Sequence, residues 1–209
     1  ARFIGFFADD KLKKVELATG NIELISEAGF GGGGTWNTEG TILFGPQSTT
    51  GPAVLHRVPM SGGAPVPVTA LERAFGLHAW PQFLPDGRHY LYRRTEVDGL
   101  SGVFVGQLDS DNYQPLLVAP TPSRPDGGVD GLENVVGRAT YAEGHLFYVR
   151  AGSLFAQRFD IERRELRGDP VRIADDVFQD GPGRAAFDVA SGVLAYRTRV
   201  PSGVGQLSW

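Results

Sequence analysis

Apolar and polar residues alternate over short stretches of this chain, and turn residues separate the stretches. The clearest example runs from Pro81 to Tyr92, where an apolar stretch ends at Asp86-Gly87 and an alternating apolar stretch follows. Asp-Gly between two apolar runs favours a hairpin, because glycine accepts a positive φ and aspartate tolerates one. The pattern therefore predicts two antiparallel β-strands joined by a turn at these two residues.

The same hairpin pattern occurs at three more places. Its turns have an acidic or small polar residue before glycine: Glu39-Gly40, Glu143-Gly144 and Ser191-Gly192. An aromatic residue anchors the second strand of each copy, at spacings of 48, 56 and 48 residues: Phe44, Tyr92, Tyr148 and Tyr196. A third apolar strand follows each hairpin, and a polar turn and a short fourth strand come after it in all but the last copy. The chain therefore consists of repeats, each of which predicts four antiparallel strands.

Four short antiparallel strands at a period of about 40–50 residues are typical of the blades of a β-propeller. The inner strands are apolar on both faces, which a single sheet can bury only between two neighbours. The predicted fourth strands contain Pro67, Pro115 and Pro170, and proline is tolerated at a sheet edge because it cannot donate to the ladder. An array of immunoglobulin-like sandwiches would instead need about seven strands per unit. We therefore predict an all-β fold, a β-propeller of four-stranded antiparallel blades.

The repeats divide the chain into five segments, at about 1–34, 35–77, 80–136, 138–183 and 184–209. The middle three read as complete blades, and the first and last have three strands each. We therefore expect residues 1–209 to form a single propeller domain or a fragment of one. Three ways of closing the ring stay open, namely further blades in a longer protein, a smaller ring, and the association of several copies, which would pair the free strand edges.

The composition of the chain excludes several classes of function, and it adds less to the predicted fold. Of the 209 residues, 41% are hydrophobic and 21% charged, and 29 glycines and 14 prolines fit a β-protein rich in turns. The formal net charge of −4, without a basic stripe, argues against nucleic-acid binding. No apolar run approaches the ~18 residues that cross a membrane, so no membrane insertion is expected. The absence of cysteine excludes disulfides and thiolate metal sites.

Motifs that would indicate catalysis are incomplete. Residues 31–34 are four glycines without the lysine of a phosphate loop, and they predict a flexible crossing between blades. Asp109, Asp111 and Asn112 resemble the start of a calcium loop that lacks its glycine and distal glutamate, and they predict an ordinary turn. A glycosidase needs two carboxylates on the inner strands, where only Asp188 is acidic. We therefore expect no catalytic residue, no metal and no cofactor in this chain.

One position in the repeat indicates binding. Three residues before the recurrent aromatic of the inner strand, near the channel entrance of a propeller, the repeats have Gly33, Trp80, Arg138 and Arg184. Together with His78, the tryptophan and the two arginines predict a cationic, aromatic-rimmed site for an anionic or peptidic partner. The alternative is that the arginines pair with Asp130, Glu133 or Asp180 in neighbouring loops. Residues 119–136 add a loop rich in proline and glycine, which suits either a binding loop or a spacer.

Residues 83–92 read Phe-Leu-Pro-Asp-Gly-Arg-His-Tyr-Leu-Tyr, which resembles the aromatic-x-Pro-Asp-Gly-Arg hairpin of TolB-like, or WD40-like, propeller repeats. Residues 12–17, 29–36, 40–44 and 78–87 are similar to propellers that follow bacterial serine/threonine kinase domains. The resemblance covers essentially the whole chain. It implies a ring of six or seven blades and a periplasmic or other extracytoplasmic location.

Three functions are compatible with these patterns. The first is a non-catalytic scaffold for protein–protein or ligand recognition, similar to the sensor part of a bacterial multidomain protein, with a protein or peptide as partner. The second is the gating propeller of a prolyl-oligopeptidase-like hydrolase, whose catalytic domain would lie outside this chain. The third and most remote is a small-ring sugar binder or glycosidase. We favour the first. A hydrolase domain with a Gly-x-Ser-x-Gly motif outside this chain would support the second, and the third needs paired acids that the inner strands lack.

Overall fold

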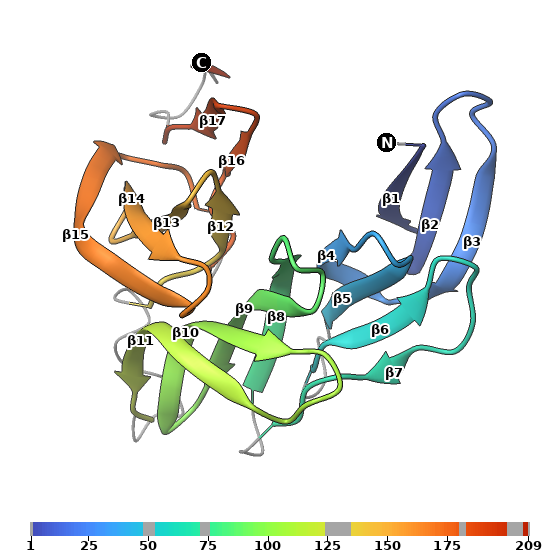
Figure 1. Ribbon diagram of the computed structural model, residues 1–209, viewed down its shortest axis with the longest axis horizontal. Coiled ribbons are helices and arrows are strands. Elements are labelled where there is room, and N and C mark those ends of the chain that lie inside the picture. The colour runs from blue at the N-terminus through green and yellow to red at the C-terminus, as the bar shows by residue number, and fades with distance from the viewer. Residues whose placement is uncertain are drawn as a thin grey trace. The chain divides into compact units, whose positions relative to one another are not determined.

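The computed structural model describes residues 2–47, 53–71, 76–123, 135–179, 183–199 and 207–208. Within these ranges the chain forms β-strands, bridges and turns (Figure 1). The described strands make three sheets of four and two of three, and the neighbouring strands within β1–β3, β4–β7, β12–β15 and β16–β18 are antiparallel. The predicted all-β fold of four-stranded repeats is therefore confirmed. No helix in the described part of the chain could span a membrane.

The chain divides into two compact units, Ala1–Tyr90 with Gly106–Asn112, and Leu91–Val105 with Tyr113–Trp209. The first unit contains a three-stranded sheet of β1 (Phe3–Ala8), β2 (Lys11–Glu16) and β3 (Ile22–Glu27). It also contains a four-stranded sheet of β4 (Phe30–Trp36), β5 (Thr41–Gln47), β6 (His56–Pro59) and β7 (Val66–Pro67). Both sheets contribute to its buried core: Leu12, Ile25, Ala28, Ile42, Phe44 and Val58.

The third sheet has the order β11-β10-β9-β8, with β8 (Gly76–Phe83), β9 (His89–Glu96), β10 (Gly99–Gln107) and β11 (Tyr113–Thr121). The fourth sheet consists of β12 (Ala139–Ala142), β13 (His145–Arg150), β14 (Ser153–Asp160) and β15 (Glu165–Ala174). The last has three strands, β16 (Phe187–Ala190), β17 (Val193–Arg197) and β18 (Leu207–Ser208). A core of the second unit joins the last two sheets: Val149, Leu154, Val177, Ala185 and Phe187.

The fourth strand of each complete repeat lies at the edge of its sheet. Pro67 lies in β7, Pro115 in β11 and Pro170 in β15, and each of these strands has a hydrogen-bonded neighbour on one side only. Proline has no N–H to donate, so an edge strand accommodates it at a position whose N–H would otherwise face outward. The proline pattern thus indicated the correct strand of each sheet.

The hairpin turns adopt two backbone conformations. In the turn between β12 and β13, Glu143 and Gly144 both have positive φ, +48° and +78°, and Ser191-Gly192 between β16 and β17 is alike at +50° and +75°. Positive φ at both central residues defines the type I′ turn, whose twist matches that of the flanking strands. The turn after β8 is longer, and the Asp86 carboxylate accepts hydrogen bonds from the backbone N–H groups of Arg88 and His89 at 3.0 and 2.9 Å.

The four consecutive glycines do not form a crossing between sheets, which corrects the prediction made for them. They lie inside β4, and the pairing of β4 with β5 shifts register between Gly31 and Gly34. A Cβ on Gly31 would overlap the ring of Phe7, and one on Gly33 would lie 2.7 Å from Cε3 of Trp80. These positions are glycine because aromatic side chains pack directly on the backbone of the strand.

Candidate functional site

The turn between the third and fourth strands of a sheet contacts the sheet that precedes it in sequence. Gly63 N donates to Ile25 O at 3.2 Å, and Gln114 Nε2 donates to Arg164 O at 3.0 Å. In the turn between β10 and β11, Asp109 has a φ of +59°, and the Ser110 hydroxyl accepts from Asn112 N at 3.1 Å. This is the ordinary turn that the sequence predicts for residues 109–112.

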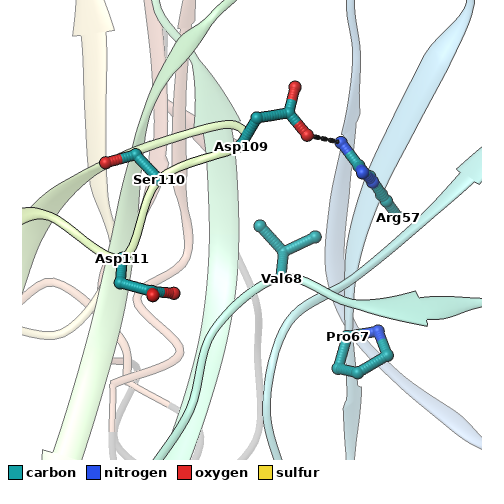
Figure 2. A pocket seen from close by; sticks show the side chains of 6 residues that line it. All are labelled: Arg57, Pro67, Val68, Asp109, Ser110 and Asp111. Carbon is teal, nitrogen blue, oxygen red and sulfur yellow. Dashed lines mark hydrogen bonds and ion pairs between the residues drawn. The ribbon is translucent and has the colours of Figure 1, made fainter.

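A polar pocket of about 200 Å³ lies where this turn faces β6 and β7 (Figure 2). Asp109, Ser110 and Asp111 come from the turn. Arg57 lies in β6 and Pro67 in β7, and Val68 directly follows β7. Arg57 Nη1 donates to Asp109 Oδ1 at 2.5 Å across the mouth of the pocket. Val68 and Pro67 give it an apolar floor, and the side chain of Asp111 points toward that floor.

The charges of the pocket do not balance. Arg57 and Asp109 form one ion pair, and they are 38% and 68% exposed, so the pair contributes under about 1 kcal/mol to stability. Asp111 adds a second carboxylate, and no cation among the described residues pairs with it. The pocket thus has a formal charge of −1 and suits a cationic or hydrogen-bond-donating group. The described residues contain no group of three His, Cys, Asp or Glu side chains that could hold a metal ion.

Two of the predicted binding residues lie in the first unit. His78 is fully buried, and its Nδ1 lies 2.8 Å from the Thr69 hydroxyl, so its ring is part of the interior rather than of an exposed rim. Trp80 is half-buried, and its φ of +55° is unusual for a bulky residue. Such backbone conformations persist where surrounding packing holds them, here against Gly33. A binding role for Trp80 stays a prediction.

The other two predicted residues, Arg138 and Arg184, lie in the second unit. Arg138 Nη2 donates to Asp188 Oδ1 at 2.9 Å, and its guanidinium lies 5.7 Å from the ring centre of Phe187. Arg184 is exposed, at the start of the segment that enters β16. The alternative partners Asp130, Glu133 and Asp180 lie outside the described residues, as does most of the loop predicted over 119–136. The structure thus assigns Arg138 a partner, Asp188, that the sequence reasoning considered only as a catalytic acid.

Sequence reasoning missed the buried arginines of β9. Arg93 is 3% exposed and Arg94 is 4% exposed, on opposite faces of the strand. Arg94 donates to the Glu96 carboxylate at 2.7 Å, and its guanidinium lies over the rings of Phe104 and Tyr113. The signal that could have found them is two adjacent arginines in a strand that is otherwise apolar on both faces.

No protein-family model matches the sequence, and no curated protein matches it. Solved structures do match. TolB from Acinetobacter baumannii superimposes with a TM-score of 0.62 and 14% identity, over 99% of this chain and 48% of that chain. A protein described as a TolB of Agrobacterium tumefaciens gives 0.59 and 15% identity, over 95% of this chain and 66% of that one. The fold is that of a TolB-like β-propeller.

The TolB-like fold assigns the strands their places in a blade. The first strand of each complete sheet, β4, β8 and β12, is an inner strand, and β7, β11 and β15 are outer strands. This chain spans less than two thirds of the length of either TolB structure. A prolyl endopeptidase also superimposes, with a TM-score of 0.47 and 10% identity over 99% of this chain and 40% of that one, which is too low to support an argument.

Proposed function

We propose that this chain forms part of a non-catalytic β-propeller that recognises a protein or peptide partner. The observation that carries the proposal is the pocket of Arg57, Asp109, Ser110 and Asp111 between two rigid sheets. Its volume of about 200 Å³ is below the ~300–1,000 Å³ of typical small-molecule sites. A space of this size suits one side chain of a larger partner, and polar turns on a rigid scaffold are common binding elements.

The charge of the pocket indicates which side chain it takes. With Arg57 neutralised by Asp109, the carboxylate of Asp111 is available to a lysine or arginine of the partner, and the Ser110 hydroxyl can contribute a further hydrogen bond. The stem of a lysine or arginine would pack on Val68 and Pro67, because such stems bury their methylene groups on apolar surface. We therefore propose a basic residue as the anchor of the partner.

The inner strands support a non-catalytic role. Asp188 is the acidic residue of the inner-strand segments, and it is ion-paired with Arg138 at 2.9 Å. A glycosidase would need a second carboxylate about 5–10 Å away, with one of the two held protonated. The carboxylate of Asp188 instead contacts the guanidinium of Arg138 at hydrogen-bonding distance, which suits a structural or binding role better than that of a general acid.

Selection of peptides from a random display library on the folded chain would test this proposal. We expect the selected peptides to share a lysine or arginine, and Asp111→Asn to weaken their binding about tenfold, because a charge-assisted hydrogen bond is lost. Glu162→Gln is a matched control, since Glu162 is an exposed carboxylate in the equivalent turn between β14 and β15. Equal binding to wild type and Asp111→Asn would refute the pocket as the recognition site.

A further inference from the structure

Arg93 is a buried cation without a counter-ion. Its side chain is 3% exposed, its Nε is buried without a hydrogen-bond partner, and no carboxylate in the described part of the chain pairs with it. Burial lowers the pKa of Arg93 to about 10, so the guanidinium stays charged at neutral pH. Removing a charge from water without compensation is costly. The fold would therefore be expected to compensate this charge with an anion.

A second donor lies on the same face of the strand. Thr95 follows Arg93 by two residues in β9, and alternate residues of a strand share a face. The Thr95 hydroxyl oxygen is buried and has no hydrogen-bond partner among the described residues. A guanidinium and a hydroxyl on one face, both unsatisfied, are the donor set of an oxyanion site.

Two glycines make close approach to Arg93 possible. Gly183 has a φ of +93°, and a Cβ on it would overlap Arg93 Nε and lie 2.8 Å from Cδ. A Cβ on Gly137 would in turn lie 2.5 Å from the Cα of Gly183. The two segments are joined by a hydrogen bond from Arg138 N to Gly183 O of 2.9 Å. The backbone that covers Arg93 is therefore free of side chains at the two points of contact.

Gly137 is followed by Arg138, whose guanidinium is paired with Asp188. Two cations of the second unit, Arg93 and Arg138, thus lie on or beside one crossing of the chain, and the described acid Asp188 pairs with Arg138. This excess of positive charge would attract an anion toward the crossing.

We propose that Arg93 and Thr95 form an anion site at the Gly137–Gly183 crossing, which takes a carboxylate. A carboxylate is favoured because its two coplanar oxygens match the fork of a guanidinium, and because it can also accept from a neighbouring hydroxyl. The carboxylate comes from a small organic acid or from the C-terminus of a peptide. The site does not depend on the pocket at Arg57, since the two share no residue.

The experiment measures the melting temperature of the chain in sodium acetate against sodium chloride at equal ionic strength. At ten times the dissociation constant, acetate is expected to raise Tm of the wild type by about 3 °C or more. Arg93→Met is expected to fold and to lose this difference, because methionine fills the space without the charge. Thr95→Val keeps the charge and is expected to weaken the acetate response about tenfold in concentration. Arg163→Met, at an exposed arginine that belongs to neither proposed site, is the control that should leave the response intact.

Two further comparisons are needed. The first distinguishes the two sources of the carboxylate, and the second tests the alternative that a carboxylate of the chain itself fills the site. If the site takes peptide C-termini, triglycine with a free C-terminus should raise Tm as acetate does, and triglycine amide should not. If neither peptide raises Tm, the site takes only small organic acids. Asp180→Asn tests whether a chain carboxylate already fills the site. An acetate response that appears only in Asp180→Asn, or a response equal in wild type and Arg93→Met, overturns the proposal.

Discussion

Tyr90 shows how one side chain determines its neighbour in the sheet. It is 1% exposed, and a Cβ on Gly106 would lie 2.5 Å from Cζ of its ring, so this position of β10 has to be glycine. Burial raises the pKa of Tyr90 to about 12. The neutral phenol is therefore favoured in the folded state, relative to a pKa of about 10 in the unfolded chain.

This shift predicts a pH dependence. The contribution of the Tyr90 phenol to stability is fully present below pH 10 and is lost as the pH rises from about 10 through about 12, because the unfolded chain ionises first. Tyr90→Phe has no proton to lose, so its free energy of unfolding should fall less over that interval than that of the wild type. Urea unfolding between pH 8 and pH 11.5 measures both slopes, and parallel curves would contradict the assignment.

Residue environments were the least predictable part of the molecule. His78 was predicted from the sequence to be a binding residue, whereas its ring is buried against Thr69. Arg93, which is buried inside an apolar strand, was not predicted to have any role. Both cases depend on which face of a strand meets a neighbouring sheet. Alternation identifies the two faces of a strand but not what packs on each when both are buried.

Hairpins are the element that the sequence describes best, because their requirements are local. The turn at Glu143-Gly144 has positive φ at both residues, and nothing lies within 4 Å of a Cβ added to Gly144. The conformation of this turn therefore depends on the backbone alone. It has the positive φ angles of a type I′ turn, the turn type that Asn-Gly sequences also favour. Edge strands were predictable for the same reason, through the missing N–H of proline.

Substitutions in this turn should separate backbone preference from packing. Glu143→Asn is expected to stabilise the chain by about 0.5 kcal/mol, because asparagine adopts positive φ more readily than glutamate. Gly144→Ala is expected to cost about 1 kcal/mol, and Gly144→Asn less, although a Cβ at this position has no atom within 4 Å. Chemical denaturation of the three variants gives the order. An equal loss for alanine and asparagine would show that something other than the left-handed backbone decides stability here.

For the whole molecule, the repeat period also determines which residues meet. Arg57 contacts Asp109 across 52 residues, and Arg138 contacts Asp188 across 50. Asn37 likewise donates to Gly87 O across 50 residues. Each separation is close to one repeat, so a residue of one sheet contacts its equivalent region in the next. The pocket at Arg57 was therefore accessible to sequence reasoning in principle, by pairing each polar residue with those one period later. The proposed anion site could not be predicted from the sequence, because its donors are recognised only by their lack of hydrogen-bond partners in the structure.

Contacts of one period make stability a nearest-neighbour property, as in other repeat proteins. Leu12→Ala, in the core of the first unit, and Leu154→Ala, in that of the second, delete the same atoms from sites 3% and 0% exposed. Each should cost about 2–5 kcal/mol locally. We expect Leu12→Ala to speed hydrogen exchange in β1–β5 and leave β12–β15 protected, and Leu154→Ala to do the reverse, in exchange measured by mass spectrometry. Equal acceleration across all sheets in both variants would instead mean that the sheets unfold as one cooperative unit, because no local opening would then precede global unfolding.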